Sequence, residues 1–146
     1  MESIKDLVTG FQFDRWANTL WIEALQRKDA TADDWAIMQH ILAAQEIWLS
    51  RCQGHSLSSM PAPEPTVDNL EKLTAQWLEI LSEDHGNPTI SFKRLTGETH
   101  ELTLHEIMHH VINHGTYHRG ELRGVCRARG DNDFPETDRM RFVIFR

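Results

Sequence analysis

The sequence predicts an all-α fold, an up-and-down four-helix bundle with a short hairpin-like connection before the last helix. Two observations support this prediction. Apolar residues recur at helical spacing in four long stretches, and clusters of Gly, Pro and polar residues separate these stretches. At 146 residues, the chain has the length of one domain, residues 1–146, that is able to bury a core.

The first two helices are expected near residues 3–27 and 33–52. Apolar residues follow a period of about 3.6 through both stretches, which is typical of helices with one buried face. In the second helix, His40 lies in the same arc as Ile37 and Ala44. An imidazole in such an arc is either a buried polar group that needs a partner or a metal ligand, and this helix alone leaves both interpretations open.

The third and fourth helices are expected near residues 67–84 and 103–129. Between them, the alternation of apolar and polar residues from 89 to 95 predicts a small hairpin or a strand-like connection. After the fourth helix, the apolar run from Phe142 to Phe145 must cover an apolar surface of this chain or contact a partner chain.

Charge and composition restrict the classes of function. The formal net charge of −7 disfavours a general nucleic-acid or anionic-membrane binder, because both need an electropositive face. No apolar run reaches membrane-spanning length and the N-terminus lacks a signal-peptide pattern, so a cytoplasmic location is expected. Cys52 and Cys126 lie far apart and form no Cys-x-x-Cys motif, so both are expected to be reduced, mostly buried residues.

Histidine is concentrated in the fourth predicted helix. An advance of ~100° per residue places His114 and His118 inside or at the edge of the apolar arc. His105 and His109 lie on the far side of the helix, where solvent is expected, and His110 lies between the two groups. The helix therefore has one pair of histidines that is predicted to point inward.

Two imidazoles one helical turn apart are able to bind the same ion. The alternative is that they are core histidines with ordinary hydrogen-bond partners. A third inward ligand distinguishes these interpretations, and His40 supplies one from the second helix. His40, His114 and His118 are thus a predicted set of three imidazoles, which leaves positions on an ion open and is typical of a catalytic rather than a structural site.

Three segments also carry a family resemblance: residues 13–18 (FDRWAN), 40–48 (HILAAQEIW) and 110–122 (HVINHGTYHRGEL). In them, and over essentially its whole length, the chain resembles the DinB/YfiT-like superfamily. The resemblance implies an up-and-down four-helix bundle, often dimeric, with a metal triad at His40, His114 and His118. Better understood members look like transferases and isomerases that use low-molecular-weight thiols.

One position departs from the family pattern, which often has Gln after His-Arg-Gly where this chain has Glu121. The helical wheel places Glu121 near His114, where a carboxylate is able to orient a metal ligand or to act as an acid. The alternative is a surface carboxylate that pairs with a neighbouring Arg. Tyr117, Arg119 and Asn18 are further candidates for substrate contacts, with packing or surface roles as their alternative.

These features predict a metal-dependent enzyme, either a thiol-dependent S-transferase or a hydrolase, that acts on a small electrophilic substrate. The expected cofactors are one divalent ion, zinc or nickel, and a low-molecular-weight thiol for the transferase. The alternative is a non-catalytic, stress-associated metal-binding dimer. A homodimer is expected in both cases, since the chain is rich in Trp and Phe and aromatic residues are enriched at interfaces. Neither nucleic acid nor membrane is an expected partner.

Overall fold

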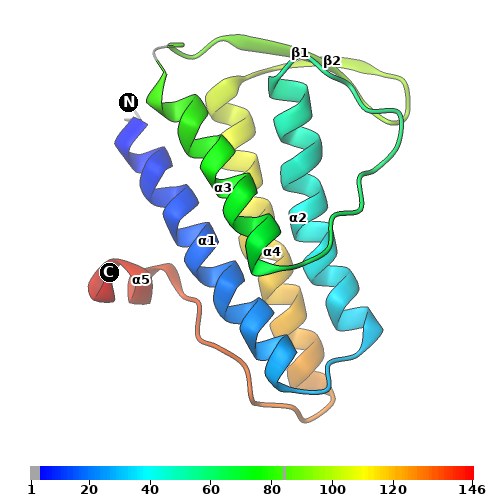
Figure 1. Ribbon diagram of the computed structural model, residues 1–146, viewed down its shortest axis with the longest axis vertical. Coiled ribbons are helices and arrows are strands. Elements are labelled where there is room, and N and C mark those ends of the chain that lie inside the picture. The colour runs from blue at the N-terminus through cyan, green and yellow to red at the C-terminus, as the bar shows by residue number, and fades with distance from the viewer. Residues whose placement is uncertain (1–3, 84) are drawn as a thin grey trace.

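Four long helices lie side by side in the computed structural model, which describes residues 4–83 and 85–146 (Figure 1). The described elements are α1 (Ile4–Arg27), α2 (Ala32–Cys52), α3 (Val67–Ser82), β1 (Thr89–Lys93), β2 (Thr99–Thr103), α4 (Leu104–Ala128) and α5 (Arg139–Phe145). All four predicted helices are present near their predicted positions. Residues 3 and 84, the predicted first and last residues of two helices, lie outside the described part of the chain.

The two strands make the strictly all-α prediction wrong, while they confirm the hairpin-like connection. They pair antiparallel, with Thr89 opposite Thr103 and Phe92 opposite His100. Gly97 lies in the connecting turn with a φ of 95°, a conformation that glycine adopts without steric cost. The alternating pattern of β1 directs Phe92 toward α2, where its ring lies 5.0 Å from that of Trp48.

The order of helix directions also differs from the prediction. In Figure 1, α1 and α4 run away from the sheet, whereas α2 and α3 both run toward it. The simple up-and-down order is therefore wrong for α2 and α3. The reason is the Pro-containing segment 53–66, which returns along the helices. Extended chain covers about 3.3 Å per residue against 1.5 Å in a helix, so a short segment spans the length of α2.

The core lies between the four long helices. Each of them packs against two others in particular, α1 against α3 and α4, and α2 against α4 and α3. Phe11 and Trp77 stack with their ring centroids 5.1 Å apart and join α1 to α3. Thr31 and Thr103 begin α2 and α4 with capping boxes, in which the side chain accepts a hydrogen bond from a backbone N–H of the first turn. The two helices that carry the three predicted histidine ligands, α2 and α4, therefore each begin at a capped residue.

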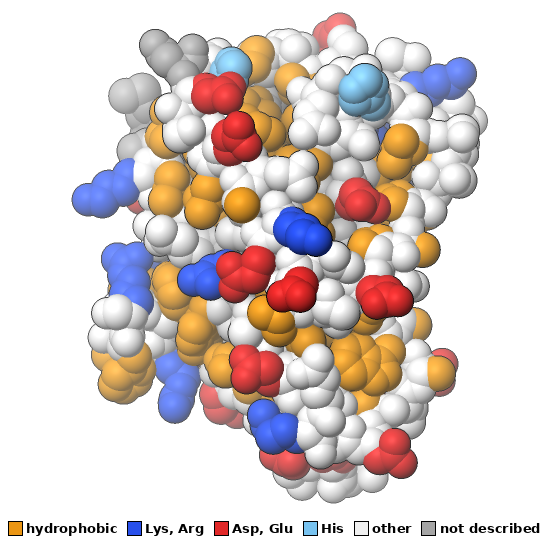
Figure 2. All heavy atoms as spheres, in the orientation of Figure 1, with side chains coloured by type: hydrophobic (Ala, Val, Ile, Leu, Met, Phe, Trp, Pro, Cys, Tyr) orange, Lys and Arg blue, Asp and Glu red, His pale blue; other side chains and the backbone are white. Residues whose placement is uncertain are grey.

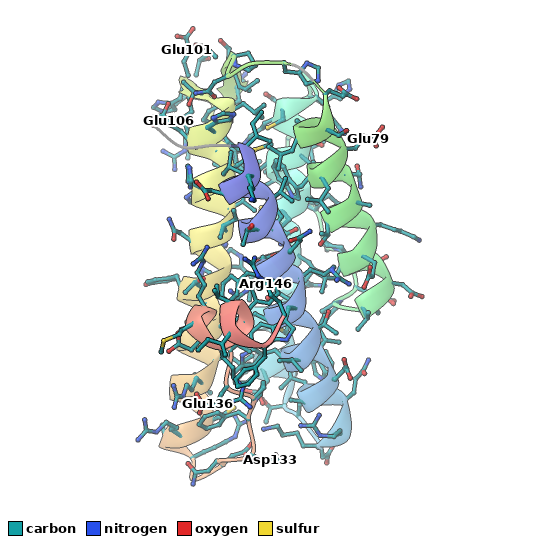
Figure 3. All side chains as sticks on the ribbon, turned by 90° about the vertical axis from the view of Figure 1, so that its left-hand side faces the viewer. Glu79, Glu101, Glu106, Asp133, Glu136 and Arg146 are labelled. Atoms are coloured by element: carbon teal, nitrogen blue, oxygen red, sulfur yellow. The ribbon has the colours of Figure 1, made fainter. Side chains whose placement is uncertain are left out.

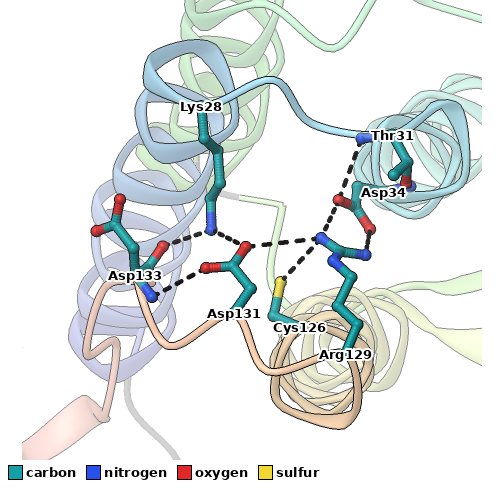
Figure 4. Close-up of polar contacts among 7 residues, drawn as sticks. All are labelled: Lys28, Thr31, Asp34, Cys126, Arg129, Asp131 and Asp133. Carbon is teal, nitrogen blue, oxygen red and sulfur yellow. Dashed lines mark hydrogen bonds and ion pairs between the residues drawn. The ribbon is translucent and has the colours of Figure 1, made fainter.

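Charged side chains join the far end of α4 to the turn between α1 and α2 (Figure 4). Arg129 donates to both carboxylate oxygens of Asp34, with Nη1 2.9 Å from Oδ1. Lys28 donates to Asp131 at 2.9 Å and to the carbonyl of Asp133. Because these contacts hold the C-terminal end of α4 against the start of α2, they limit the sliding of α4 along α2.

The C-terminal residues fold back on α1, as Figure 3 shows for α5. Phe142 packs against Phe13 and Trp16, with ring centroids 5.9 and 5.5 Å away. Within the predicted apolar tail, Phe142 is therefore the residue that packs against the same chain. Its other apolar side chains stay exposed, Ile144 at 62 % and Phe145 at 76 %, and hydrophobic and basic side chains lie together over α5 in Figure 2.

None of the helices in the described part of the chain is long and apolar enough to cross a membrane.

Candidate metal centre

The packing of α2 along α4 brings three histidines together. His114 and His118 lie one turn apart on α4, and His40 faces them from α2. The Nε2 atoms of His40 and His114 are 3.1 Å apart, and the ring centroid of His118 lies 4.5 Å from that of His40 and 4.4 Å from that of His114. One nitrogen from each ring lies within 4.8 Å of the others.

This histidine group lies at the surface edge of the α2–α4 contact and not in the core. His40 is exposed, while His114 and His118 are half-buried. The prediction that all three point into a buried face is therefore wrong in this respect. The helical wheel gives the direction of a side chain around one helix axis, but its burial depends on how the neighbouring helix packs. Here the three histidines lie at the solvent-exposed edge where α2 meets α4. Solvent and small molecules reach the group.

The surroundings of His114 and His40 favour the neutral form of these two imidazoles. Partial burial, assisted by the nearby His118, His40 and His110, lowers the pKa of His114 to about 4. Burial also lowers the pKa of His40, assisted by His118 and opposed by Glu121. A neutral imidazole carries a free lone pair on one nitrogen, which is the form that binds a metal.

Glu121 contacts the group through His118, with Oε1 2.9 Å from Nδ1. A carboxylate at this distance accepts a hydrogen bond from the Nδ1–H group, and the free lone pair of the imidazole is then on Nε2. The wheel placed Glu121 near His114, but the i, i+3 spacing pairs it with His118 instead. Its described partner is thus a candidate ligand and not a neighbouring Arg.

The donor set fits a divalent ion of the zinc type. With metal–nitrogen bonds of ~2.0–2.1 Å in a tetrahedral site, two ligand nitrogens lie roughly 3.3 Å apart, close to the 3.1 Å between His40 and His114. Within the described residues the group holds three members and no fourth His, Cys, Asp or Glu. His110 has its ring centroid 5.6 Å from that of His114 and lies outside the group.

Comparison with known proteins supports the family resemblance that was found in three sequence segments. The model of the DinB family matches residues 9–142. The chain belongs to the DinB family. It is also similar to Protein DinB of Bacillus subtilis (strain 168), with 24% identity over 108 residues, which cover 64% of this chain and 63% of that protein. The match thus spans somewhat less than two thirds of the relative.

Three other candidate residues of this DinB-family chain differ in their surroundings. Tyr117 is 73% exposed and its ring centroid lies 5.0 Å from that of His118, so it borders the histidine group. Asn18 and Arg119 are buried instead, and Arg119 Nη1 donates to the Oδ1 atom of Asn18 at 2.7 Å. Both take part in an internal hydrogen-bond network, so the structure does not bring them to the histidines.

The centre of that network is Asp14, which sequence reasoning did not single out. Its Oδ1 atom lies 3.2 Å from Arg119 Nη1, and Oδ2 accepts from Gln45 at 2.6 Å and from Asn18 at 3.1 Å. Burial raises the pKa of Asp14 and lowers that of Arg119, while their mutual attraction acts in the opposite direction. The available signal was the presence of charged and amide residues within stretches that otherwise read as core.

Both cysteines are free, as predicted, with Cys126 buried and Cys52 half-buried. Burial raises the pKa of Cys52 to about 12 and also raises that of Cys126. Since the thiolate is the reactive form, neither side chain is suited to act as a nucleophile near neutral pH.

A cleft of about 880 Å³ begins at His40 and His114 and continues toward the sheet. Its walls come from α2, α4, the hairpin and the segment after α2, and include Trp48, Arg51 and Phe92. Sequence reasoning did not select these residues, because they come together only when the hairpin folds over α2. A separate cavity of about 590 Å³ lies between α1, α4 and residues 135–139 and contains none of the three histidines.

Proposed function

We propose that this DinB-family chain is a metal-dependent enzyme in which His40, His114 and His118 hold one divalent ion, zinc or nickel. We interpret its four long helices as a four-helix bundle to which the sheet and α5 are added. The observation that carries the proposal is the convergence of three imidazoles, two of which, His40 and His114, line a cleft of about 880 Å³. Such a set leaves coordination positions on the ion open toward a substrate.

Each residue near the group has a defined task in this proposal. The three imidazoles supply the ligand nitrogens, and Glu121 orients His118 by accepting a hydrogen bond from its Nδ1–H group. When bound, a divalent ion supplies a Lewis acid that lowers the pKa of a thiol or a water. Tyr117, exposed beside His118, is able to contact a substrate at the rim. Since Cys52 and Cys126 are unsuited as nucleophiles, the nucleophile comes from outside the chain.

We infer a thiol-dependent S-transferase first and a hydrolase second, with a small electrophile as substrate and the cytoplasm as location. The preference for a low-molecular-weight thiol over water rests on the family resemblance. The surface position of the histidine group supports either nucleophile, because both reach it from solvent. A non-catalytic, stress-associated metal-binding role is the rival, and a fourth protein ligand would have favoured it.

Metal analysis tests the site itself. Protein purified without a His-tag and loaded with zinc should retain one ion per chain, measured by inductively coupled plasma mass spectrometry. His118→Ala should lose stoichiometric binding, because two imidazoles remain. His55→Ala, in the exposed loop after α2, is the matched control and should bind normally. Unchanged binding by the His118 variant would refute the assignment.

Spectroscopy of the cobalt-substituted protein tests the reaction class. Titration with glutathione, bacillithiol and mycothiol should produce a thiolate-to-cobalt charge-transfer absorption for one of them. If azide changes the cobalt spectrum and no thiol does, the hydrolase is favoured. If neither thiols nor azide change it, the non-catalytic rival is correct.

We also propose that the chain forms a homodimer. Only Phe142 of the apolar tail is buried, whereas Met140, Ile144 and Phe145 are exposed, and apolar surface of this kind is stabilised by a partner. Light scattering coupled to size exclusion should give twice the chain mass at micromolar concentration. Phe145→Ser together with Ile144→Ser should shift the species toward monomer. A wild-type monomer under these conditions would contradict the proposal.

A further inference from the structure

Arg51 is a buried cation that has no anionic partner among the described residues. It is 8% exposed, and its guanidinium carbon lies 4.4 Å from the ring centroid of Trp48 and 4.9 Å from that of Phe92. Its Nε atom is buried without a hydrogen-bond partner, and no carboxylate of the described residues forms an ion pair with it. Burial lowers its pKa, and the charge of Arg94 lowers it further.

The other buried arginine of the chain shows what a structural role requires. Arg119 is 3% exposed and donates to Asp14, Asn18 and Thr116. A buried charge is normally compensated by such partners. Arg51 has two aromatic faces, which attract a cation but accept no N–H hydrogen bond of ordinary strength. Its compensation within the chain is therefore incomplete.

The cleft that contains Arg51 is positive in this region. Arg94 also lines it and has one described ion pair, a 3.6 Å contact with Glu98 on the exposed surface. The two carboxylates of the cleft have other partners. Glu106 accepts the backbone N–H of Thr103 at 2.9 Å, and Glu101 accepts from Ser91 at 3.2 Å.

Neither of these carboxylates compensates Arg51. Neither Glu101 nor Glu106 is among the charges that shift the pKa of Arg51. His110 does respond to Arg51, since its pKa is lowered by burial and then by the Arg51 charge. Around the guanidinium, the described charges are thus cationic.

We propose that the cleft binds a small organic anion, a carboxylate or a phosphate monoester, with its anionic group at Arg51 and Arg94. Its apolar portion lies against Trp48, Phe92 and the aliphatic wall formed by Ile47, Met60 and Leu95. The guanidinium of Arg51 packs beside both rings, and its planar group is able to donate two parallel hydrogen bonds to such an anion.

The same cleft reaches His40 and His114, so the opposite end of the ligand lies at the histidine group. Its volume of about 880 Å³ is in the range of pockets for small organic molecules. This step rests on the proposed function, and it narrows the substrate of the metal site to an anionic electrophile or an anionic thiol. Anion binding at Arg51 itself requires no metal.

The test is a nuclear magnetic resonance titration that follows the indole N–H of Trp48 in metal-free and zinc-loaded protein. The probes are phenylacetate, phenyl phosphate and the uncharged benzyl alcohol. At low ionic strength at least one anion should bind tenfold or more tightly than benzyl alcohol, and added salt should weaken it. The tighter of the two anions identifies the head group.

Four variants locate the binding. Arg51→Met keeps the apolar stem and should lower the anion affinity at least tenfold, whereas Arg51→Lys should restore part of it. Arg15→Met, which removes an exposed arginine paired with Glu71 on the α1–α3 side, is the matched control and should bind as wild type. If Arg51→Met unfolds by circular dichroism, Arg94→Met decides and should lower the affinity about threefold.

Equal binding of benzyl alcohol and the anions, or unchanged affinity in the folded Arg51 or Arg94 variants, overturns the inference. The outcome is separable from that of the proposed function. Anion binding that persists in a protein unable to hold metal removes the enzyme proposal and keeps the anion site. Normal metal binding without discrimination between anion and alcohol removes the anion site and keeps the proposed metal site.

Discussion

His118 and Arg119 are consecutive residues of α4, yet they belong to two different polar groups. Arg119 points into the protein and joins Asp14, Asn18 and Thr116 in a buried network. His118 points to the rim and joins two other imidazoles. A residue step of ~100° around a helix is enough to separate them.

The two groups differ in the partners of their polar atoms. In the buried network, the donors of Arg119 meet acceptors of the chain, so the network holds α1, α2 and α4 together and offers little to a ligand. In the histidine group, one hydrogen bond to Glu121 orients His118, and one nitrogen from each of the three rings lies within 4.8 Å of the others. Polar atoms that are paired inside the core therefore mark a structural group, whereas ligand nitrogens that converge at a solvent-accessible edge mark a binding site.

The largest expected effect comes from Arg119→Met, which separates the two groups most sharply. It leaves Asp14 as a buried carboxylate without its cation, a change that typically costs about 3–5 kcal/mol of unfolding free energy. Urea denaturation followed by circular dichroism measures it. Arg123→Met is the control, since Arg123 is exposed and its ion pair with Glu136 is worth little. A loss of less than 1 kcal/mol for Arg119→Met would mean that the network is not structural.

Gly115→Ala should destabilise the buried network by adding a methyl group beside Asp14 and Arg119. A Cβ at this position would lie 2.6 Å from Asp14 Oδ1 and 2.9 Å from Arg119 Nη1, so a cost of about 1–3 kcal/mol is expected from overpacking. Gly120→Ala is the matched control on the same helix, because nothing lies within 4 Å of its added Cβ. It should stabilise by about 0.5–1 kcal/mol through helix propensity. Equal melting temperatures for both variants would contradict the close packing.

Glu121→Ala should weaken the histidine group without affecting the core. Loss of a carboxylate that orients a ligand typically lowers metal affinity about 10–100-fold. Competition with a zinc chelator measures this, and Glu121→Gln should lose less because it retains an acceptor oxygen. The unfolding free energy of the metal-free variants should stay near that of wild type. A wild-type zinc affinity in Glu121→Ala would show that His118 needs no orientation.

The smallest effect concerns pH. The hydrogen bonds from Arg129 hold the pKa of Asp34 below its usual value, against burial, which raises it. A carboxylate with a lowered folded-state pKa stabilises the fold above its unfolded value near 3.8, and this contribution is lost as pH falls further. Asp34→Asn should therefore flatten the decline of stability below about pH 4, measured by urea denaturation at several pH values. An unchanged slope would indicate that the ion pair is screened.

Local spacing determined much of the molecule from sequence. Four apolar periodicities indicated four helices, an alternating stretch indicated the hairpin, and the four-residue spacing of His114 and His118 placed them together. Each of these features depends on residues a few positions apart, where the geometry of a helix or strand is known in advance. The resemblance of three segments to the DinB family then agreed with the choice of His40.

Tertiary packing decided the features that depend on distant residues. The parallel direction of α2 and α3 follows from the course of residues 53–66, and the exposure of His40 follows from how α2 meets α4. Asn18 and Arg119 became network members because both donate to Asp14, which is over 100 positions from Arg119. Arg51 contacts Phe92 because the hairpin folds over the end of α2. Burial and partnership are properties of three-dimensional neighbours, and a periodicity along one helix carries no information about them.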